Sequence, residues 1–219
     1  MPITTSTNSK SSLSLIIFDF DGVLVDSFDL FFKLNKEALA RVGLKLTKII
    51  YRDFFNGNVH ASFRSFTKDD QQYKNFQKYR QAGLDEAYAN PRLFPFAISL
   101  VKKLSKHYPL AIASSTPREL IMQVLKKHRL EKYFFFVSGS QGHSKEEALR
   151  AIIKKAGAQP QQTVMITDTV GDILVAQKVD LKTIAVTWGF HSKNTLSKSK
   201  PNKIIQNFKS LEKNLIPPN

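Results

Sequence analysis

Two aspartates one residue apart follow an apolar run near the start of the chain. The run begins at Leu15 and leads through Asp19, Phe20 and Asp21 to Gly22. One carboxylate can attack as a nucleophile, and a second beside it can act as a general acid and base. Gly22 permits the sharp backbone turn that such a pair needs after a strand. Acids after strands are also common turn residues, so this pair alone leaves both interpretations open.

A second pair of acids, Asp168 and Asp172, follows the apolar residues 163–167. Magnesium prefers hard oxygen ligands, and one or two carboxylates, waters and substrate phosphate oxygens commonly complete its shell. Two acidic strand ends brought side by side would repel each other without a cation. Asp172 could instead favour the first turn of a helix through the helix dipole, but this explains one acid of four. We therefore expect Mg²⁺ where these acids meet Asp19 and Asp21.

Hydroxyl groups and a lysine occupy two further element boundaries. Ser114, Ser115 and Thr116 end an apolar run, and hydroxyls with free backbone N–H groups at a helix start form a phosphate cradle. Thr116 could serve only as a helix N-cap. Lys145 falls in the first turn of an expected helix, where the helix dipole disfavours a cation. Neutralising a phosphoryl group would account for that position, although a solvated surface lysine is the simpler alternative.

Short apolar runs without polar alternation predict strands that are buried on both faces, as in a parallel sheet. Helical patterns lie between them, with capping boxes expected at Thr116 and Ser144. This order predicts an α/β fold with a Rossmann-like, doubly wound parallel sheet, whose strand ends form the ligand site. The expected strands are residues 15–20, 110–114, 134–137, 163–167 and 183–187. Residues 193–201 are expected to be a polar loop before a final strand and helix.

Residues 28–94 interrupt the alternation of strand and helix. They carry no convincing buried strand but show helical spacing at Leu30, Leu34, Ala38 and Val42. We expect a helical subdomain inserted into an α/β core that is formed by residues 13–27 and 95–219. Residues 1–12 lack the features of a secretory signal and are expected to be a disordered leader.

The composition limits the class of protein. The 219 residues include no cysteine, which excludes disulfides and thiolate chemistry, and contain no apolar run long enough to span a bilayer. A cytoplasmic location is the default expectation. The formal charge of +15 could indicate nucleic-acid binding, but the basic residues are spread along the chain. A solvated basic surface is therefore the preferred interpretation, and nucleic acid is not the expected partner.

Together these motifs resemble the haloacid dehalogenase-like hydrolase superfamily. Residues 18–27 match its first motif, Ile112–Ser115 resemble the second, Lys145 the third and residues 167–172 the fourth. The resemblance runs from Leu13 through nearly the whole chain. The helical insert is similar to the cap of the phosphoglycolate phosphatase and β-phosphoglucomutase-like branch. The resemblance thus implies a phosphohydrolase.

The resemblance also implies roles for individual residues. Asp19 would attack phosphorus and form an aspartyl-phosphate, and Asp21 would act as general acid and then general base. Ser114 and Lys145 would hold the phosphoryl oxygens. Magnesium would be held by Asp19, the backbone carbonyl of Asp21, and Asp168, with Asp172 orienting a metal-bound water or Lys145. The further residues expected to bind phosphate or substrate are Ser115, Gly22, Asn56 and Gly57, the last two in a cap loop that closes over the site.

The sequence departs from the family at Phe96, Thr167 and Asp180, where glycine is usual. These differences leave the reacting groups in place but leave the substrate open. A small phosphorylated metabolite is expected, and the cap, with 12 Lys and Arg against 7 Asp and Glu, suits a second anion on it. The alternatives are a phosphosugar mutase and a basic nucleic-acid-binding protein on the same scaffold. The protein is expected to be a monomer or a homodimer.

Overall fold

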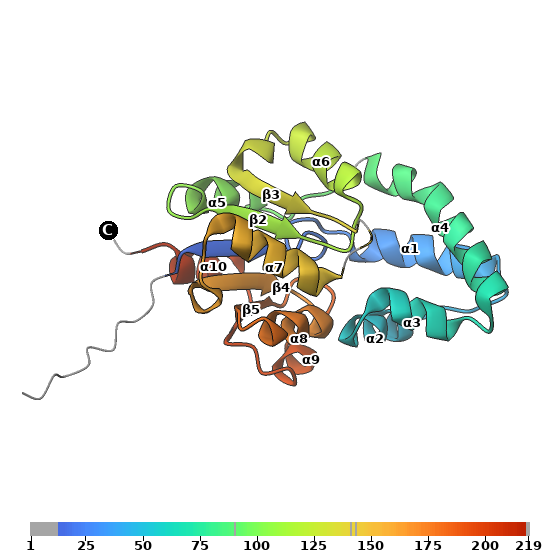
Figure 1. The fold of residues 1–219 in the computed structure, drawn as a ribbon. Helices are drawn as coiled ribbons and strands as arrows, with labels where there is room; N and C mark the ends of the chain where they lie inside the picture. Colours follow the sequence, from blue (N-terminus) through green and yellow to red (C-terminus); the bar gives the residue numbers. More distant parts are fainter. Residues whose placement is uncertain (1–12, 90, 141, 143, 218–219) are drawn as a thin grey trace, which may run out of the picture.

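The computed structural model describes residues 13–89, 91–140, 142 and 144–217, so the expected leader lies outside the described residues (Figure 1). Within that part, six parallel strands form one sheet in the order β3-β2-β1-β4-β5-β6. The strands are β1 (Leu15–Phe18), β2 (Leu110–Ala113), β3 (Phe134–Ser138), β4 (Thr163–Thr167), β5 (Lys182–Val186) and β6 (Lys203–Ile205). The order reverses between β1 and β4, and such switch points are where open α/β sheets bind ligands.

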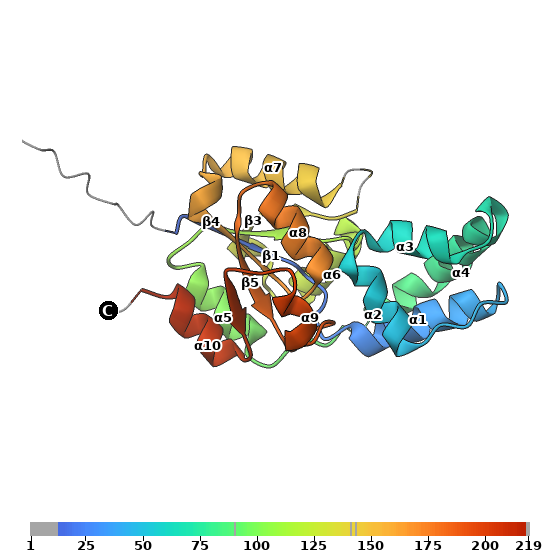
Figure 2. The same ribbon diagram turned by 90° about the horizontal axis from the view of Figure 1, so that it is seen from below.

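Helices cover both faces of the sheet, because the central strands are apolar on both faces. In β1, Ile16 and Phe18 belong to one buried cluster, whereas Leu15 and Ile17 belong to another on the opposite face. Figure 2 shows α7 on one side of the sheet and α5 and α10 on the other. The core helices are α5 (Ala97–Leu104), α6 (Arg118–Lys127), α7 (Lys145–Ala156), α8 (Val170–Lys178), α9 (Lys193–Ser197) and α10 (Phe208–Leu215).

The helices between β1 and α5 lie together beyond one end of the sheet (Figures 1 and 2). We call them the cap; they are α1 (Phe28–Ala40), α2 (Lys48–Asp53), α3 (Val59–Phe66) and α4 (Asp70–Ala89). The two connections to the core run side by side. The Asp26 N–H donates to the Arg92 carbonyl at 2.7 Å, and the Phe94 N–H donates to the Leu24 carbonyl at 3.0 Å. Both ends of the insert therefore pass through one narrow hinge.

The predicted fold class is confirmed: a doubly wound parallel sheet carries an inserted helical subdomain. All five expected strands are present, with ends that differ by at most two residues. The capping box at Ser144 is also present. Of the helices within the described residues, none is long and apolar enough to cross a membrane.

Two local predictions are wrong. Thr116 does not cap α6, which begins after Pro117 without a side-chain cap, because the Thr116 hydroxyl donates to Asp21 instead. The expected loop at residues 193–201 begins with the short helix α9, whose first turn is capped by Ser192. The helical spacing predicted from Leu30 agrees with α1, in which Leu34 is partly buried and the polar Asn35 is buried.

Candidate active site

The carboxyl ends of β1 and β4 are neighbours at the switch point. Phe18 is in register with Ile166, and the Asp19 N–H donates to the Ile166 carbonyl at 2.9 Å. Because paired strands are about 4.8 Å apart, the residues that follow them leave the sheet next to each other. These residues are Asp19 and Asp168, whose exposed fractions are 6% and 0%. The fold thus brings together two acids that are distant in sequence.

Asp168 is buried with one oxygen unsatisfied. Its Oδ2 accepts a hydrogen bond from the Phe190 N–H at 2.6 Å, whereas Oδ1 has no hydrogen-bond partner among the residues that the structure describes. Gly22 has a φ of +75°, and a Cβ at this position would lie 2.0 Å from Asp168 Oδ2. A side chain there would therefore displace the carboxylate. Burial raises the pKa of Asp168 from its usual 3.8 to about 7.

Lys145 lies between two carboxylates. Its Nζ is 3.2 Å from Asp19 Oδ1 and 2.6 Å from Asp172 Oδ2. The capping box of Ser144 fixes the start of α7 and so places Lys145 at the first helical position. Burial raises the pKa of Asp19 well above its usual range, and Lys145 opposes this only in part. Asp19 therefore needs further positive charge to be held as an anion.

Asp172 is the acid that Lys145 binds most closely. It also accepts a hydrogen bond from the Thr167 hydroxyl at 3.2 Å. Burial alone would raise the pKa of Asp172, but Lys145 and these hydrogen bonds lower it overall. Thr167 thus supports the ionised form of Asp172.

Asp21 is held by one residue from the cap and one from the core. The Tyr88 hydroxyl, at the end of α4, donates to Asp21 Oδ2 at 2.9 Å, and the Thr116 hydroxyl donates to the same oxygen at 2.5 Å. The two hydroxyl oxygens are 2.8 Å apart. Burial raises the pKa of Asp21, whereas these hydroxyl groups lower it. A carboxyl group with a raised pKa is suited to proton transfer near neutral pH.

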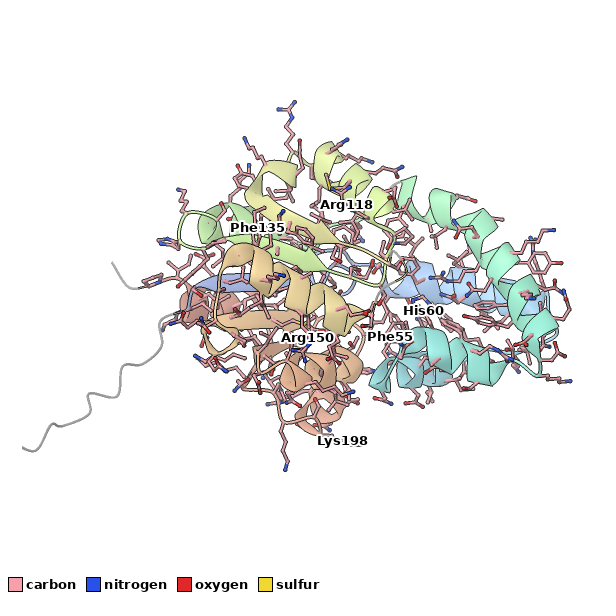
Figure 3. All side chains as sticks on the ribbon, in the orientation of Figure 1. Phe55, His60, Arg118, Phe135, Arg150 and Lys198 are labelled. Carbon is pink, nitrogen blue, oxygen red and sulfur yellow. The ribbon has the colours of Figure 1, made fainter. Side chains whose placement is uncertain are left out.

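A cavity of about 830 Å³ lies between the core and the cap. Asp19, Asp21, Lys145 and Asp172 line it, as do Ser114, Ser115 and Gly57. Ser114 Oγ accepts from the Thr116 N–H at 3.1 Å, which leaves its own proton available to a ligand. Figure 3 shows Phe55 and His60 on the part of the cap that faces the core, and both belong to the cavity wall.

The predicted site residues are not all at the cavity. Asn56 is not part of its lining, and its amide donates to Asp53 Oδ1 at 3.4 Å within the cap. Gly57 meets the core closely, because a Cβ on Gly171 would lie 2.3 Å from the Gly57 carbonyl oxygen. The loop therefore reaches the core through backbone rather than through the Asn56 side chain.

Two residues of α4 were not predicted from the sequence. Arg80 lines the cavity, and the Tyr88 hydroxyl binds Asp21. Thr116 was interpreted as a helix N-cap, and its hydrogen bond to Asp21 was not predicted. Nothing in the local pattern distinguishes the polar residues of α4 that face the core from those that face solvent. A four-residue spacing from Arg80 through Leu84 to Tyr88 was the available signal.

The residues at the switch point fit a divalent cation of the magnesium type. The unsatisfied Asp168 Oδ1 and the neighbouring Asp19 carboxylate are hard oxygen donors. Asp172 is engaged by Lys145, and the Asp21 carboxylate by hydroxyls, so Asp21 would contribute its backbone carbonyl. Within the described part of the chain, no three acidic or histidine side chains form a ready cluster. Magnesium does not require one, because water and phosphate oxygens commonly complete its shell.

Comparison with known proteins identifies the family. Residues 16–186 match the haloacid dehalogenase-like hydrolases. The chain belongs to this family. A phosphoglycolate phosphatase from Synechococcus elongatus is 30% identical over 200 residues, covering 89% of this chain and 93% of that protein. A pyrophosphatase from Oceanobacillus iheyensis is 24% identical over 207 residues, covering 91% and 95%. The predicted family and enzyme class, a phosphohydrolase, are confirmed.

Solved structures of this family have the same fold. A haloacid dehalogenase-like hydrolase from Streptococcus pneumoniae superimposes with a TM-score of 0.82 at 25% identity, covering 93% of this chain and 99% of that one. A hydrolase from Pseudomonas syringae gives a TM-score of 0.82 at 20% identity, covering 92% and 97%. Both structures thus share the fold of this chain over more than nine tenths of its length.

Proposed function

We propose that this hydrolase is a magnesium-dependent phosphatase that cleaves a small phosphate monoester through an aspartyl-phosphate on Asp19. The observation that carries the proposal is the pairing of a buried Asp19 with Lys145, beside an Asp168 oxygen that has no hydrogen-bond partner in the described part of the chain. Relatives named phosphoglycolate phosphatase support a phosphoglycolate-like substrate, with a sugar phosphate as the other small ester. We also propose that the protein acts in the cytoplasm, as a monomer or a homodimer.

Two steps follow from the positions of the acids. Asp19 attacks phosphorus, a P–O bond to the carboxylate forms, and the bond to the ester oxygen breaks as Asp21 gives that oxygen its proton. Asp21, now ionised, takes a proton from a water that attacks the acyl phosphate. The second step releases inorganic phosphate and restores both carboxyl groups.

The remaining residues position the phosphoryl group. Ser114 and Lys145 donate hydrogen bonds to its oxygens, and Ser115 adds a hydroxyl at the cavity wall. A magnesium ion held by Asp19, the Asp21 carbonyl and Asp168 would supply positive charge for the phosphate oxygens. Residues 28–94 would close over the substrate and exclude water, with Gly57 at the contact.

A substrate panel tests the proposal. Phosphoglycolate, sugar phosphates, nucleotides and pyrophosphate should be assayed for phosphate release with magnesium and with EDTA. At least one ester should be hydrolysed in magnesium, and chelation should abolish turnover. Asp19→Asn should lose essentially all activity while its melting curve stays cooperative. Undiminished turnover in EDTA, or by Asp19→Asn, would refute the proposal.

A further inference from the structure

Arg80 supplies positive charge on the cap side of the cavity. Of the described cap residues that line the cavity, it is the one lysine or arginine. No carboxylate among the described residues forms an ion pair with Arg80, and the hydrogen bond recorded for it runs from Nε to Asn35 Oδ1 at 3.1 Å. Its two Nη atoms carry four further N–H donors. A guanidinium in this situation is suited to an anion that comes from outside the chain.

Asn35 gives the guanidinium a fixed support. Its side chain is 1% exposed, and its Nδ2 donates to the Phe31 carbonyl at 2.7 Å and to the Tyr51 hydroxyl at 3.4 Å. These bonds orient the amide so that Oδ1 faces Arg80. A buried amide on a core-facing position of α1 costs free energy unless its hydrogen bonds are made. Holding Arg80 accounts for its presence there.

Arg80 and the acid Asp21 are linked along one face of α4. Arg80, Leu84 and Tyr88 follow each other at four-residue spacing, and the Tyr88 hydroxyl binds Asp21 at 2.9 Å. With a rise of about 1.5 Å per residue, the α-carbons of Arg80 and Tyr88 are about 12 Å apart. Arg80 and Asp21 line the same cavity, so one bound molecule can contact both.

His60 lines the cavity as well, but it does not provide a second cation (Figure 3). Burial lowers the pKa of His60, and the charge of Arg80 lowers it further. A histidine with a lowered pKa is neutral at pH 7, where it can donate a hydrogen bond. The positive charge on this side of the cavity therefore resides on Arg80.

We propose that Arg80, held by Asn35, binds a second anionic group of the substrate. That group is a carboxylate or a second phosphate, joined to the transferred phosphoryl group by a short carbon chain. The inference rests on the proposed function, because it names the class of substrate for the same cavity. Asn35 is a positioning residue in this arrangement.

Matched esters test this role. Phosphoglycolate is compared with 2-hydroxyethyl phosphate, and propane-1,3-diol bisphosphate with 3-hydroxypropyl phosphate, so that each pair differs in the second anion. In at least one pair, Arg80→Gln should lower kcat/KM for the ester that carries the second anion about 10- to 100-fold more than for the ester that lacks it. Arg80→Lys should lie between wild type and Arg80→Gln. The pair with the larger effect shows whether the second anion is a carboxylate or a phosphate.

Lys78→Gln is the matched control, since Lys78 is exposed on the same helix and its loss changes the net charge equally. It should leave both ratios unchanged. An equal loss of kcat/KM for both members of each pair in Arg80→Gln would mean that Arg80 only supports Asn35, and would overturn the inference.

Binding measurements separate this inference from the proposed function. Calorimetry of the same esters with Asp19→Asn, with and without Arg80→Gln, reports the second anion without turnover. If Arg80→Gln weakens binding of the esters with the second anion selectively while the wild type hydrolyses no ester, the proposed function fails and the inference stands. If neither binding nor turnover depends on the second anion, the inference fails and the proposed function stands.

Discussion

At the scale of residues, the site has too little positive charge for its substrate. Lys145 forms ion pairs with Asp19 and Asp172, and its charge also lowers the pKa of Asp21 and Asp168, so one lysine is shared among four carboxylates. Asp172 takes the shortest contact with that lysine, which leaves Asp19 and Asp168 dependent on another cation. A phosphate ester would add further negative charge. This balance of charge supports the proposed divalent ion beside Asp168.

The pKa of Asp168 gives this requirement a pH dependence. In the metal-free protein its pKa is about 7, against the usual 3.8, so the folded state holds the proton more tightly than the unfolded state. Its stabilising contribution is present below pH 3.8 and is lost as the pH rises through 7. Magnesium needs the ionised carboxylate, so the increase in Tm on adding magnesium should be larger at pH 8 than at pH 6.

Asp168→Asn provides the control for that measurement. It should abolish the magnesium-dependent increase in Tm at both pH values, while the wild type gains about 2–4 °C for each kcal/mol of binding. Scanning calorimetry with magnesium and with EDTA measures both proteins. An equal magnesium response in Asp168→Asn would place the ion elsewhere.

The sequence predicted that the acids proposed to react would meet at the strand ends, whereas it did not predict the residues that hold them. Asp19, Asp21 and Asp168 lie at strand ends, and the parallel sheet determines where strand ends meet. Tyr88 and Arg80 come from a long helix whose side chains point in all directions. Their orientation depends on how α4 packs on α1, and that packing uses the buried Asn35, which an apolar pattern does not detect.

At the scale of elements, the start of α5 holds a strained residue. Phe96 has a φ of 70° and its side chain is 73% exposed. Asp180 is also in the left-handed region, with a φ of 58°. For a residue with a Cβ, the left-handed conformation costs about 1–2 kcal/mol.

Phe96→Gly should therefore raise the free energy of unfolding by about 1 kcal/mol, since little packing is lost. Urea unfolding measures the change. Tyr79→Gly is the matched control, because this exposed aromatic lies inside α4, where glycine should destabilise by about 1 kcal/mol. Destabilisation by both substitutions would show that Phe96 contributes packing that outweighs its strain.

The strands and several helices were predictable because their apolar pattern reports burial directly. The β4 prediction is exact, since residues 163–167 are buried throughout. The start of α6 was wrong because Thr116 has two possible partners, its own helix and Asp21, and the sequence shows only the nearer one. The helix α9 was missed because its five residues carry almost no apolar pattern.

At the scale of the molecule, hydrogen bonds between side chains and backbone carbonyls join the cap to the core beside the site. The Arg52 Nε donates to the Phe190 carbonyl at 3.0 Å, and His191 Nε2 lies 2.8 Å from the Arg52 carbonyl. Phe190 also donates its N–H to Asp168, so the cap contacts the segment that binds this proposed metal ligand. The position of the cap is thus coupled to the geometry at Asp168.

Gly171 lets the two parts approach. Gly171→Ala would place a Cβ 2.3 Å from the Gly57 carbonyl oxygen, which forces the cap loop away from α8. We expect kcat/KM to fall about 10- to 100-fold through misplacement of the cavity wall. In Gly83→Ala the new Cβ would meet only the end of the flexible Leu34 side chain, so steady-state kinetics should remain near wild type. If Gly171→Ala and Gly83→Ala had the same kinetics, a functional role for the contact between Gly171 and Gly57 would be contradicted.

The identity of the nucleophile is tested most directly by trapping the covalent intermediate. Asp21→Asn removes the base for the second step, and p-nitrophenyl phosphate needs little acid assistance in the first. Mixing the two with magnesium, followed by acid quench and borohydride reduction, converts an acyl phosphate to homoserine, which peptide mass spectrometry locates. We predict homoserine at position 19 together with a burst of nitrophenol. A burst with the modification at another residue, or turnover with no protein-bound phosphate, would contradict attack by Asp19.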